Sequence, residues 1–147
     1  MTQSFRITRR VEFSDTDAAG IAHFSAFFRY MEQAEHDLLR SVGLSVLSHD
    51  DAGKISWPRV SVKCDYARPV RFEDLLDVAV SIARLGEKSV TYRFAFRLGE
   101  QPIAQGEITA VCCRFPVGGT PHSMPIPAAV VAKLQPFVEA GAANASP

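Results

Sequence analysis

The sequence contains no apolar run long enough to cross a membrane, and its first residues lack the apolar core of a secretory signal. It also lacks an excess of charge, because 16 Lys and Arg side chains balance 16 Asp and Glu side chains. A chain without a global field has no general attraction for nucleic acid or for an anionic membrane. We therefore expect a cytoplasmic protein with a small-molecule ligand, whose anionic parts would be held by a local cluster of cations.

Cysteine is scarce as well. The three cysteines, Cys64, Cys112 and Cys113, form an odd set without the spacing of a metal site, and each lies in an apolar, strand-like segment. We interpret them as buried thiols. The chain of 147 residues is 47% hydrophobic and includes ten Phe, which suffices for one substantial core. We predict a single domain over residues 1–140, followed by a flexible tail of small residues at 141–147.

Hydrophobic periodicity divides the chain into a strand, a helix and a series of further strands. Alternating apolar residues predict a strand over 5–13, and apolar positions at steps of three and four predict a helix over 26–42, which Gly43 would end. The remaining predicted elements are strands over 55–66, 75–85, 89–98 and 103–115, a turn-rich connection over 44–54 and a short terminal helix over 128–138. The short turns between strands predict an antiparallel sheet, and hence an α+β domain with one helix on one sheet face.

A group of reactive side chains lies between the first strand and the helix. Asp15 and Asp17 precede Gly20 and His23, and all four come just before the predicted helix. The first N–H groups of a helix have no internal acceptors and stabilise negative charge. A carboxylate beside such N–H groups can attack, or activate water to attack, a carbonyl whose oxygen the N–H groups hold. The same residues are also common in helix-capping loops, so the residues alone leave both interpretations open.

The run Val-Glu-Phe-Ser-Asp-Thr-Asp-Ala-Ala-Gly-Ile at 11–21, followed by the Phe-rich helix, resembles the 4-hydroxybenzoyl-CoA thioesterase family. Trp-Pro-Arg-Val at 57–60, Asp-Tyr-Ala-Arg-Pro-Val at 65–70 and Leu-Leu-Asp-Val at 75–78 extend the resemblance over residues 5–115. The resemblance implies the hotdog fold, in which one long helix is wrapped by a curved antiparallel sheet of five or six strands. It also implies a thioester hydrolase.

The resemblance further implies roles for residues of the loop. Asp17 matches the family's catalytic carboxylate, and the backbone N–H of Phe24 or its neighbour would polarise the thioester carbonyl. Gly20 would let the chain turn close to the substrate, and Asp15 would order the loop by accepting backbone N–H bonds. A large branch of the family has His where Phe24 stands. Because His23 is displaced by one residue, or about 100° at a helix start, we expect it to be structural or pocket-lining, with a catalytic role as the alternative.

Further residues are assigned to substrate binding by the same resemblance. Glu32 matches an acidic position that would either hold a water or be solvated, and Trp57, Phe27 and Phe24 are expected to line an acyl pocket. The phosphates of coenzyme A need local cations and donors, for which the candidates are Arg84, Lys88 and Ser89 around the Gly86-Glu87 turn, together with Arg59 and Arg68. No metal or other cofactor is implied, since coenzyme A is part of the substrate and product.

We therefore predict an acyl-CoA thioesterase that hydrolyses an aromatic or fatty acyl-CoA, with Asp17 as nucleophile or general base. Hotdog proteins pair across a two-fold axis with active sites at subunit boundaries, which implies a homodimer or homotetramer. Two alternatives remain open: a hotdog hydratase or dehydratase using His23 or His36 with Glu32, and a non-catalytic acyl-thioester binding module. The sequence decides neither the acyl group nor the choice between coenzyme A and an acyl carrier protein.

Overall fold

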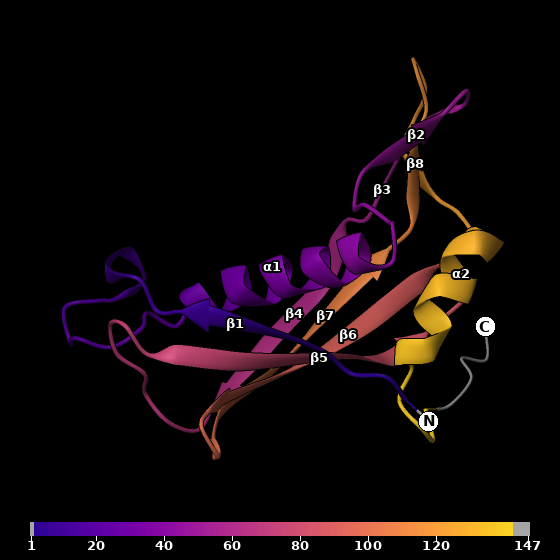
Figure 1. Ribbon diagram of the computed structural model, residues 1–147. Coiled ribbons are helices and arrows are strands. Elements are labelled where there is room, and N and C mark those ends of the chain that lie inside the picture. The colour runs from indigo at the N-terminus through magenta and orange to yellow at the C-terminus, as the bar shows by residue number, and fades with distance from the viewer. Residues whose placement is uncertain (1, 143–147) are drawn as a thin grey trace.

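The computed structural model describes residues 2–142, and within them nine strands form two antiparallel sheets (Figure 1). The larger sheet has the order β1-β5-β6-β7-β4, built from β1 (Phe5–Arg10), β5 (Leu75–Leu85), β6 (Ser89–Leu98), β7 (Gln101–Val111) and β4 (Arg59–Tyr66). The smaller sheet has the order β2-β3-β8-β9, built from β2 (Ser48–Asp50), β3 (Gly53–Ser56), β8 (Cys113–Phe115) and β9 (His122–Ser123). The expected antiparallel α+β architecture is present, with a second sheet that periodicity did not separate.

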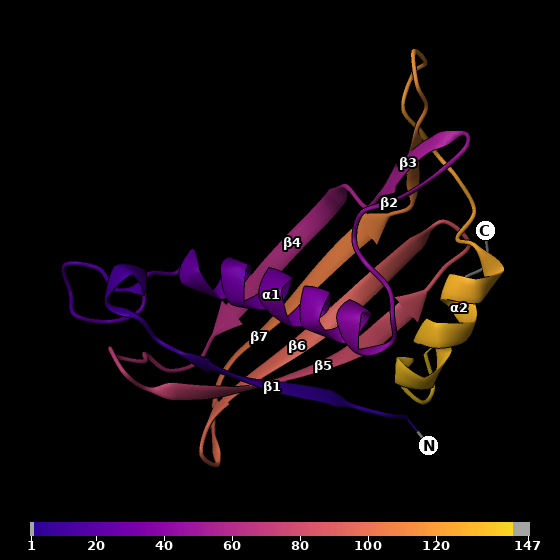
Figure 2. The same cartoon turned by 45° about the horizontal axis from the view of Figure 1, so that its top comes forward.

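Helix α1 (Ala26–Ser41) lies across one face of the larger sheet, as Figures 1 and 2 show from two directions. The buried side of α1 is apolar because its hydrophobic residues recur at steps of three and four. Alternate residues of β5 and β6 complete the core, among them Val78, Val80, Ile82, Tyr92, Phe94 and Phe96. A Cβ on Gly106 of β7 would collide with the side chain of Met31, so glycine at this position lets α1 approach the sheet.

The ends of the helices agree closely with the prediction. Val42 caps α1, and Gly43 follows with a φ of 76°, in the left-handed region that favours glycine. A second, shorter helix, α2 (Ala128–Leu134), continues into a 3-10 turn over Gln135–Phe137. The predicted tail at 141–147 lies, from residue 143 onward, outside the described residues. No helix between residues 2 and 142 is long and apolar enough to span a bilayer.

Several strand boundaries were predicted wrongly. The strand expected over 55–66 divides at Trp57-Pro58 into β3 and β4, which belong to different sheets. Pro58 has no N–H to continue a ladder. The strand expected over 103–115 divides at Cys112, whose N–H donates to the carbonyl of Lys88 at 2.7 Å. The connection expected over 44–54 contains β2 and the start of β3, and the first strand ends at Arg10 rather than at residue 13.

An ion pair is buried between α1 and the start of β4. Glu35 is 1% exposed, and its carboxylate accepts a hydrogen bond from the Arg59 guanidinium. Burial raises the pKa of Glu35 to about 7, and the attraction of Arg59 offsets only part of that effect. His36 lies next to Glu35 in sequence, and its Nε2 is buried without a hydrogen-bond partner within residues 2–142. Burial lowers the pKa of His36.

This pair predicts a pH dependence of stability. An unfolded Glu titrates near 4.3, so the native state binds the Glu35 proton more tightly than the unfolded chain does. The resulting stabilisation is complete below about pH 4.3 and is lost as the pH rises toward 7. The free energy of unfolding, measured in urea, is to be compared between the wild type and Glu35→Gln. The difference, wild type minus variant, should fall by up to about 3 kcal/mol between pH 4 and pH 8. His36 contributes the opposite slope in both proteins and cancels, so a pH-independent difference would contradict the assignment.

Candidate active site

The loop between β1 and α1 forms a narrow hairpin at one end of the larger sheet. The N–H of His23 donates to the carbonyl of Asp15 at 2.7 Å, and the N–H of Asp17 donates to the carbonyl of Ile21 at 2.9 Å. Gly20 reverses the chain with a φ of 78°, and a Cβ added there would meet nothing within 4 Å. The backbone angle therefore accounts for glycine at this position, while its approach to a substrate stays a prediction.

Asp17 is half-buried within this hairpin. Its Oδ1 accepts a hydrogen bond from the N–H of Ala19 at 2.8 Å, which orders the turn. Within residues 2–142, no side chain or backbone group donates to Oδ2 of Asp17. One carboxylate oxygen thus holds the loop in shape, and the other is available to react.

A cavity of about 450 Å³ opens beside Asp17. It is lined by Asp17, Ile21, Ala22, Phe24, Phe27, Tyr66, Ala67, Arg68, Pro69 and Val70. The lining is mostly apolar and aromatic, with one carboxylate and one guanidinium. A larger groove of about 790 Å³ on the smaller sheet offers no comparable chemistry, because its carboxylate, Asp50, is paired with Arg114.

Phe24 precedes the first turn of α1 and also lines the cavity. Its carbonyl accepts a hydrogen bond from the Tyr66 hydroxyl at 2.7 Å. In the described part of the chain, the N–H of Phe24 finds no acceptor. The cavity therefore combines a carboxylate that has a free oxygen with a residue whose N–H is unpaired at a helix start.

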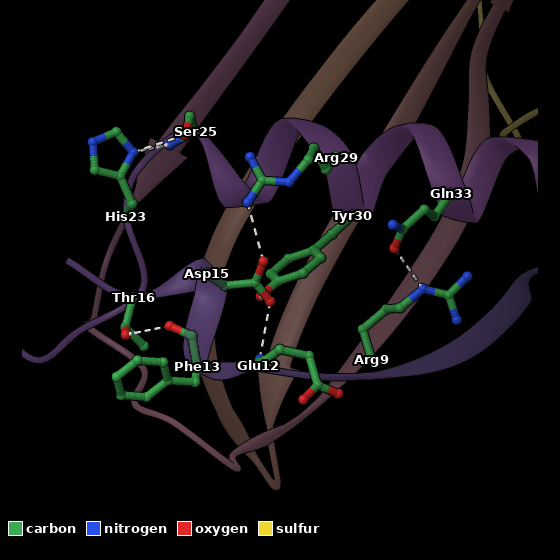
Figure 3. A network of polar contacts seen from close by, with 10 residues as sticks. All are labelled: Arg9, Glu12, Phe13, Asp15, Thr16, His23, Ser25, Arg29, Tyr30 and Gln33. Atoms are coloured by element: carbon green, nitrogen blue, oxygen red, sulfur yellow. Dashed lines mark hydrogen bonds and ion pairs between the residues drawn. The ribbon is translucent and has the colours of Figure 1, made fainter.

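Asp15 has a different environment from Asp17, although it is only two residues away. Its Oδ2 accepts hydrogen bonds from the N–H of Glu12 at 2.9 Å and from the Tyr30 hydroxyl at 2.7 Å, while its Oδ1 accepts from Arg29 at 3.0 Å (Figure 3). Burial alone would raise the pKa of Asp15, but these donors outweigh it and hold that pKa below its usual value. The expectation that Asp15 orders the loop is confirmed for the bond from Glu12; Arg29 and Tyr30 were missed, because no local pattern marks them as partners.

His23 is turned away from this group, as Figure 3 shows. Its Nδ1 lies 2.8 Å from the Ser25 hydroxyl and accepts the N–H of Ser25 at 3.2 Å. Its ring packs against Phe24 with centroids 4.3 Å apart. Neither His23 nor the exposed Glu32 of α1 is among the residues that line the cavity, so their catalytic roles stay untested predictions.

The other residues expected to bind substrate divide between two ends of the molecule. Phe27 and Arg68 line the same cavity as Asp17. The other five expected residues lie at or near the opposite end of the larger sheet, where β5 turns into β6 and β4 begins. They are Trp57, Arg59, Arg84, Lys88 and Ser89. Trp57 lines a separate cavity of about 310 Å³ with Pro127 and Val130, and Arg59 is engaged by Glu35.

The strand register sets the separation of these two ends. Arg10, which leads into the loop, pairs with Leu75 at the start of β5, whereas the Gly86-Glu87 turn follows the end of β5. Eleven residues of strand span roughly 35 Å. One chain therefore does not bring Asp17 and Lys88 to the same small cavity.

Comparisons with known proteins identify the family of the chain and the fold that it shares with solved structures. A profile of the family described as the thioesterase-like superfamily matches residues 11–134. A 1,4-dihydroxy-2-naphthoyl-CoA hydrolase of Synechococcus sp. strain WH7803 is 31% identical over 113 residues, which cover 72% of this chain and 74% of the relative. The solved structure of a gentisyl-coenzyme A thioesterase is similar with a TM-score of 0.77 at 30% identity, covering 88% of this chain and 99% of that chain.

A 1,4-dihydroxy-2-naphthoyl-CoA thioesterase from Synechocystis shares the fold, with a TM-score of 0.80 at 24% identity over 90% of this chain and 96% of that chain. The hotdog-type fold is thus found among the structural neighbours, and the expected enzyme class, thioester hydrolase, is confirmed by the relatives and neighbours named as such enzymes. The chain belongs to the thioesterase-like superfamily.

Proposed function

We propose that the chain hydrolyses the thioester of an aromatic acyl-CoA to the free acid and CoA, with Asp17 as the reacting carboxylate. The observation that carries this proposal is the cavity beside the loop, where a carboxylate with a free oxygen and the residue with an unpaired N–H line one apolar wall. The proposed reaction uses no metal or other cofactor, and CoA enters it as part of the substrate and leaves as a product. The expected cytoplasmic location stays a prediction.

The reaction follows from the polarity of these two groups. Attack on the thioester carbon, by Asp17 or by water that Asp17 deprotonates, moves negative charge onto the carbonyl oxygen. A hydrogen bond from the N–H of Phe24 would stabilise that charge without reorganisation. The C–S bond then breaks, the CoA thiolate takes up a proton, and the acyl group receives the hydroxyl of water. If Asp17 attacks directly, water hydrolyses the resulting acyl anhydride and restores the carboxylate.

The aromatic wall of the cavity favours an aromatic acyl group. Phe27 and Tyr66 meet edge to face, with ring centroids 5.2 Å apart, and they line the cavity together with the more exposed Phe24, so its surfaces are largely aromatic. Such surfaces exclude water and can stack or pack edge-on with a bound ring. The relatives named for naphthoyl-CoA and gentisyl-CoA substrates support the same choice.

The edge strand β4 supports a homodimer with shared sites. Within residues 2–142, β4 pairs only with β7, and two apolar residues of this edge strand, Val60 and Val62, are 63% and 42% exposed. Two β4 edges paired antiparallel about a two-fold axis would set the Tyr66 end of one chain beside the Arg59 end of the other. A second copy would thereby bring its Trp57 region, and its cations around Lys88, toward the Asp17 cavity. A homotetramer stays a further prediction.

Asp17→Asn tests the central assignment. Asparagine keeps the oxygen that accepts the N–H of Ala19, so the loop should keep its shape while the charge is lost. Release of thiol from a benzoyl or dihydroxynaphthoyl CoA ester should fall on the order of 10²- to 10⁴-fold. Wild-type turnover in this variant would refute the role of Asp17. If the wild type hydrates an enoyl-CoA without releasing thiol, the hydratase alternative is favoured. If the wild type binds the acyl-CoA without turnover, the binding module is favoured.

Val62→Asp tests the shared site. A charge on the apolar edge of β4 should convert dimers to monomers in sedimentation experiments and abolish hydrolysis, because a single chain brings only two of the seven expected binding residues, Phe27 and Arg68, to the Asp17 cavity. Val117→Asp is the matched control, since Val117 is 91% exposed and lies outside β4. A monomeric Val62→Asp variant with full activity would show that one chain suffices.

Lys88→Ala tests the phosphate site. The Michaelis constant should rise about tenfold for a CoA ester and stay unchanged for the truncated pantetheine thioester, which lacks the nucleotide phosphates. Mixing this variant with Asp17→Asn should restore activity at low substrate concentration, because a mixed dimer contains one site with both residues intact. Equal effects on both thioesters would remove Lys88 from the phosphate site.

A further inference from the structure

Two tyrosine hydroxyls bond to groups beside the Asp17 carboxylate and the Phe24 N–H, the two groups proposed to act on the thioester. Tyr30 of α1 donates to the carboxylate of Asp15, and Tyr66 of β4 donates to the carbonyl of Phe24, each at 2.7 Å. We propose that Tyr30 and Tyr66 are positioning residues, which together fix the Asp17 carboxylate relative to the Phe24 N–H. This inference rests on the proposed function, since it matters to catalysis only if those two groups act on the thioester.

The bond from Tyr30 controls the side of the loop that carries Asp17. Asp15 precedes Asp17 by two residues, and its carbonyl also accepts the N–H of His23, directly before Phe24. Asp15 thereby links α1, the part of the loop that carries Asp17, and the residue directly before the Phe24 N–H. Asp15 and Tyr30 are 9% and 3% exposed. A buried carboxylate that loses a donor moves to regain one, so loss of the Tyr30 hydroxyl should shift the hairpin.

The bond from Tyr66 controls the side of the site that carries the N–H. The direction of the Phe24 N–H depends on the rotation of the residue, and a hydrogen bond at its carbonyl restrains that rotation. Tyr66 is the last residue of β4 and reaches Phe24 across 42 positions of sequence. This restraint comes from the sheet and adds to a local one, because the His23 carbonyl, which shares a peptide with the Phe24 N–H, accepts the N–H of Ala26 at 2.9 Å.

Phe27 connects the two tyrosines. Its ring packs edge to face with Tyr30 at a centroid distance of 5.8 Å and with Tyr66 at 5.2 Å. Phe27 is 3% exposed, so it has little room to move independently of either ring. The two tyrosines should therefore act as a coupled unit, and their effects on the rate should not multiply.

Both hydroxyls keep their protons over the working pH range. Burial raises the pKa of Tyr66 to about 12, and burial together with the charge on Asp15 raises that of Tyr30 above its usual value. Removing either hydroxyl should therefore lower the plateau of the pH–rate profile without displacing its limbs.

The test compares Tyr30→Phe, Tyr66→Phe and the double variant with the wild type, in the full-length protein with a benzoyl or dihydroxynaphthoyl CoA ester. We expect kcat to fall about 10- to 100-fold in each single variant with KM within about twofold, because small misplacements of reacting groups cost rates of this order. Tyr92→Phe is the matched control. Tyr92 is a buried tyrosine of β6 outside the loop and the cavity, and its replacement should leave kcat unchanged.

Wild-type kcat in both single variants, with only a lower midpoint of unfolding, would overturn the inference and leave the hydroxyls a purely structural role. If Tyr30→Phe does not fold, Tyr66→Phe decides, because Tyr66 is 45% exposed and loss of its hydroxyl disturbs the core less. Asp17→Asn measured alongside separates the two proposals. Retained activity there refutes the proposed function, whereas an inactive Asp17→Asn with unimpaired tyrosine variants refutes the positioning role alone.

Discussion

Burial of the apolar side of α1 against the larger sheet is the contact on which the rest of the molecule depends. Each large side chain buried there contributes about 1.5–3 kcal/mol, and the close approach at Gly106 fixes how the helix lies on β7. Once α1 is fixed, its first turn has one position relative to the end of β1. The hairpin at 15–23 bridges that gap, so the core of the protein also determines where the Phe24 N–H lies.

The elements that periodicity predicted well are those in which burial is continuous. β5 and β6 were predicted with their observed bounds because alternate residues face the core along their whole length. The prediction for α1 was one residue too long, because its apolar stripe reaches Val42, which caps the helix. The segment 55–66 was predicted wrongly because its apolar residues continue through Trp57-Pro58, where the chain passes from one sheet to the other. Periodicity reports which residues are buried, but it does not report which sheet buries them.

The candidate site shows the same division between local and long-range information. The turn at Gly20 and the polar loop before the helix are local features, and the sequence indicates them directly. The bonds from Tyr30 and Tyr66 join residues 15 and 42 positions apart, and no spacing announces them. Likewise, resemblance assigned Trp57, Lys88 and Asp17 to one site, but strand register places them at opposite ends of one sheet. A sequence does not state whether such residues meet within a chain or across a two-fold axis.

Asp15 and Asp17 illustrate how environment separates the roles of two carboxylates in one loop. Asp15 uses both oxygens to accept three donors, and those donors hold its pKa below its usual value. Such a carboxylate is a fixed anion that organises its surroundings. Asp17 uses one oxygen for the N–H of Ala19 and faces the cavity. Because an attacking or proton-accepting oxygen must be free of other partners, the less satisfied carboxylate is the one suited to chemistry, and the more satisfied one is suited to hold it there.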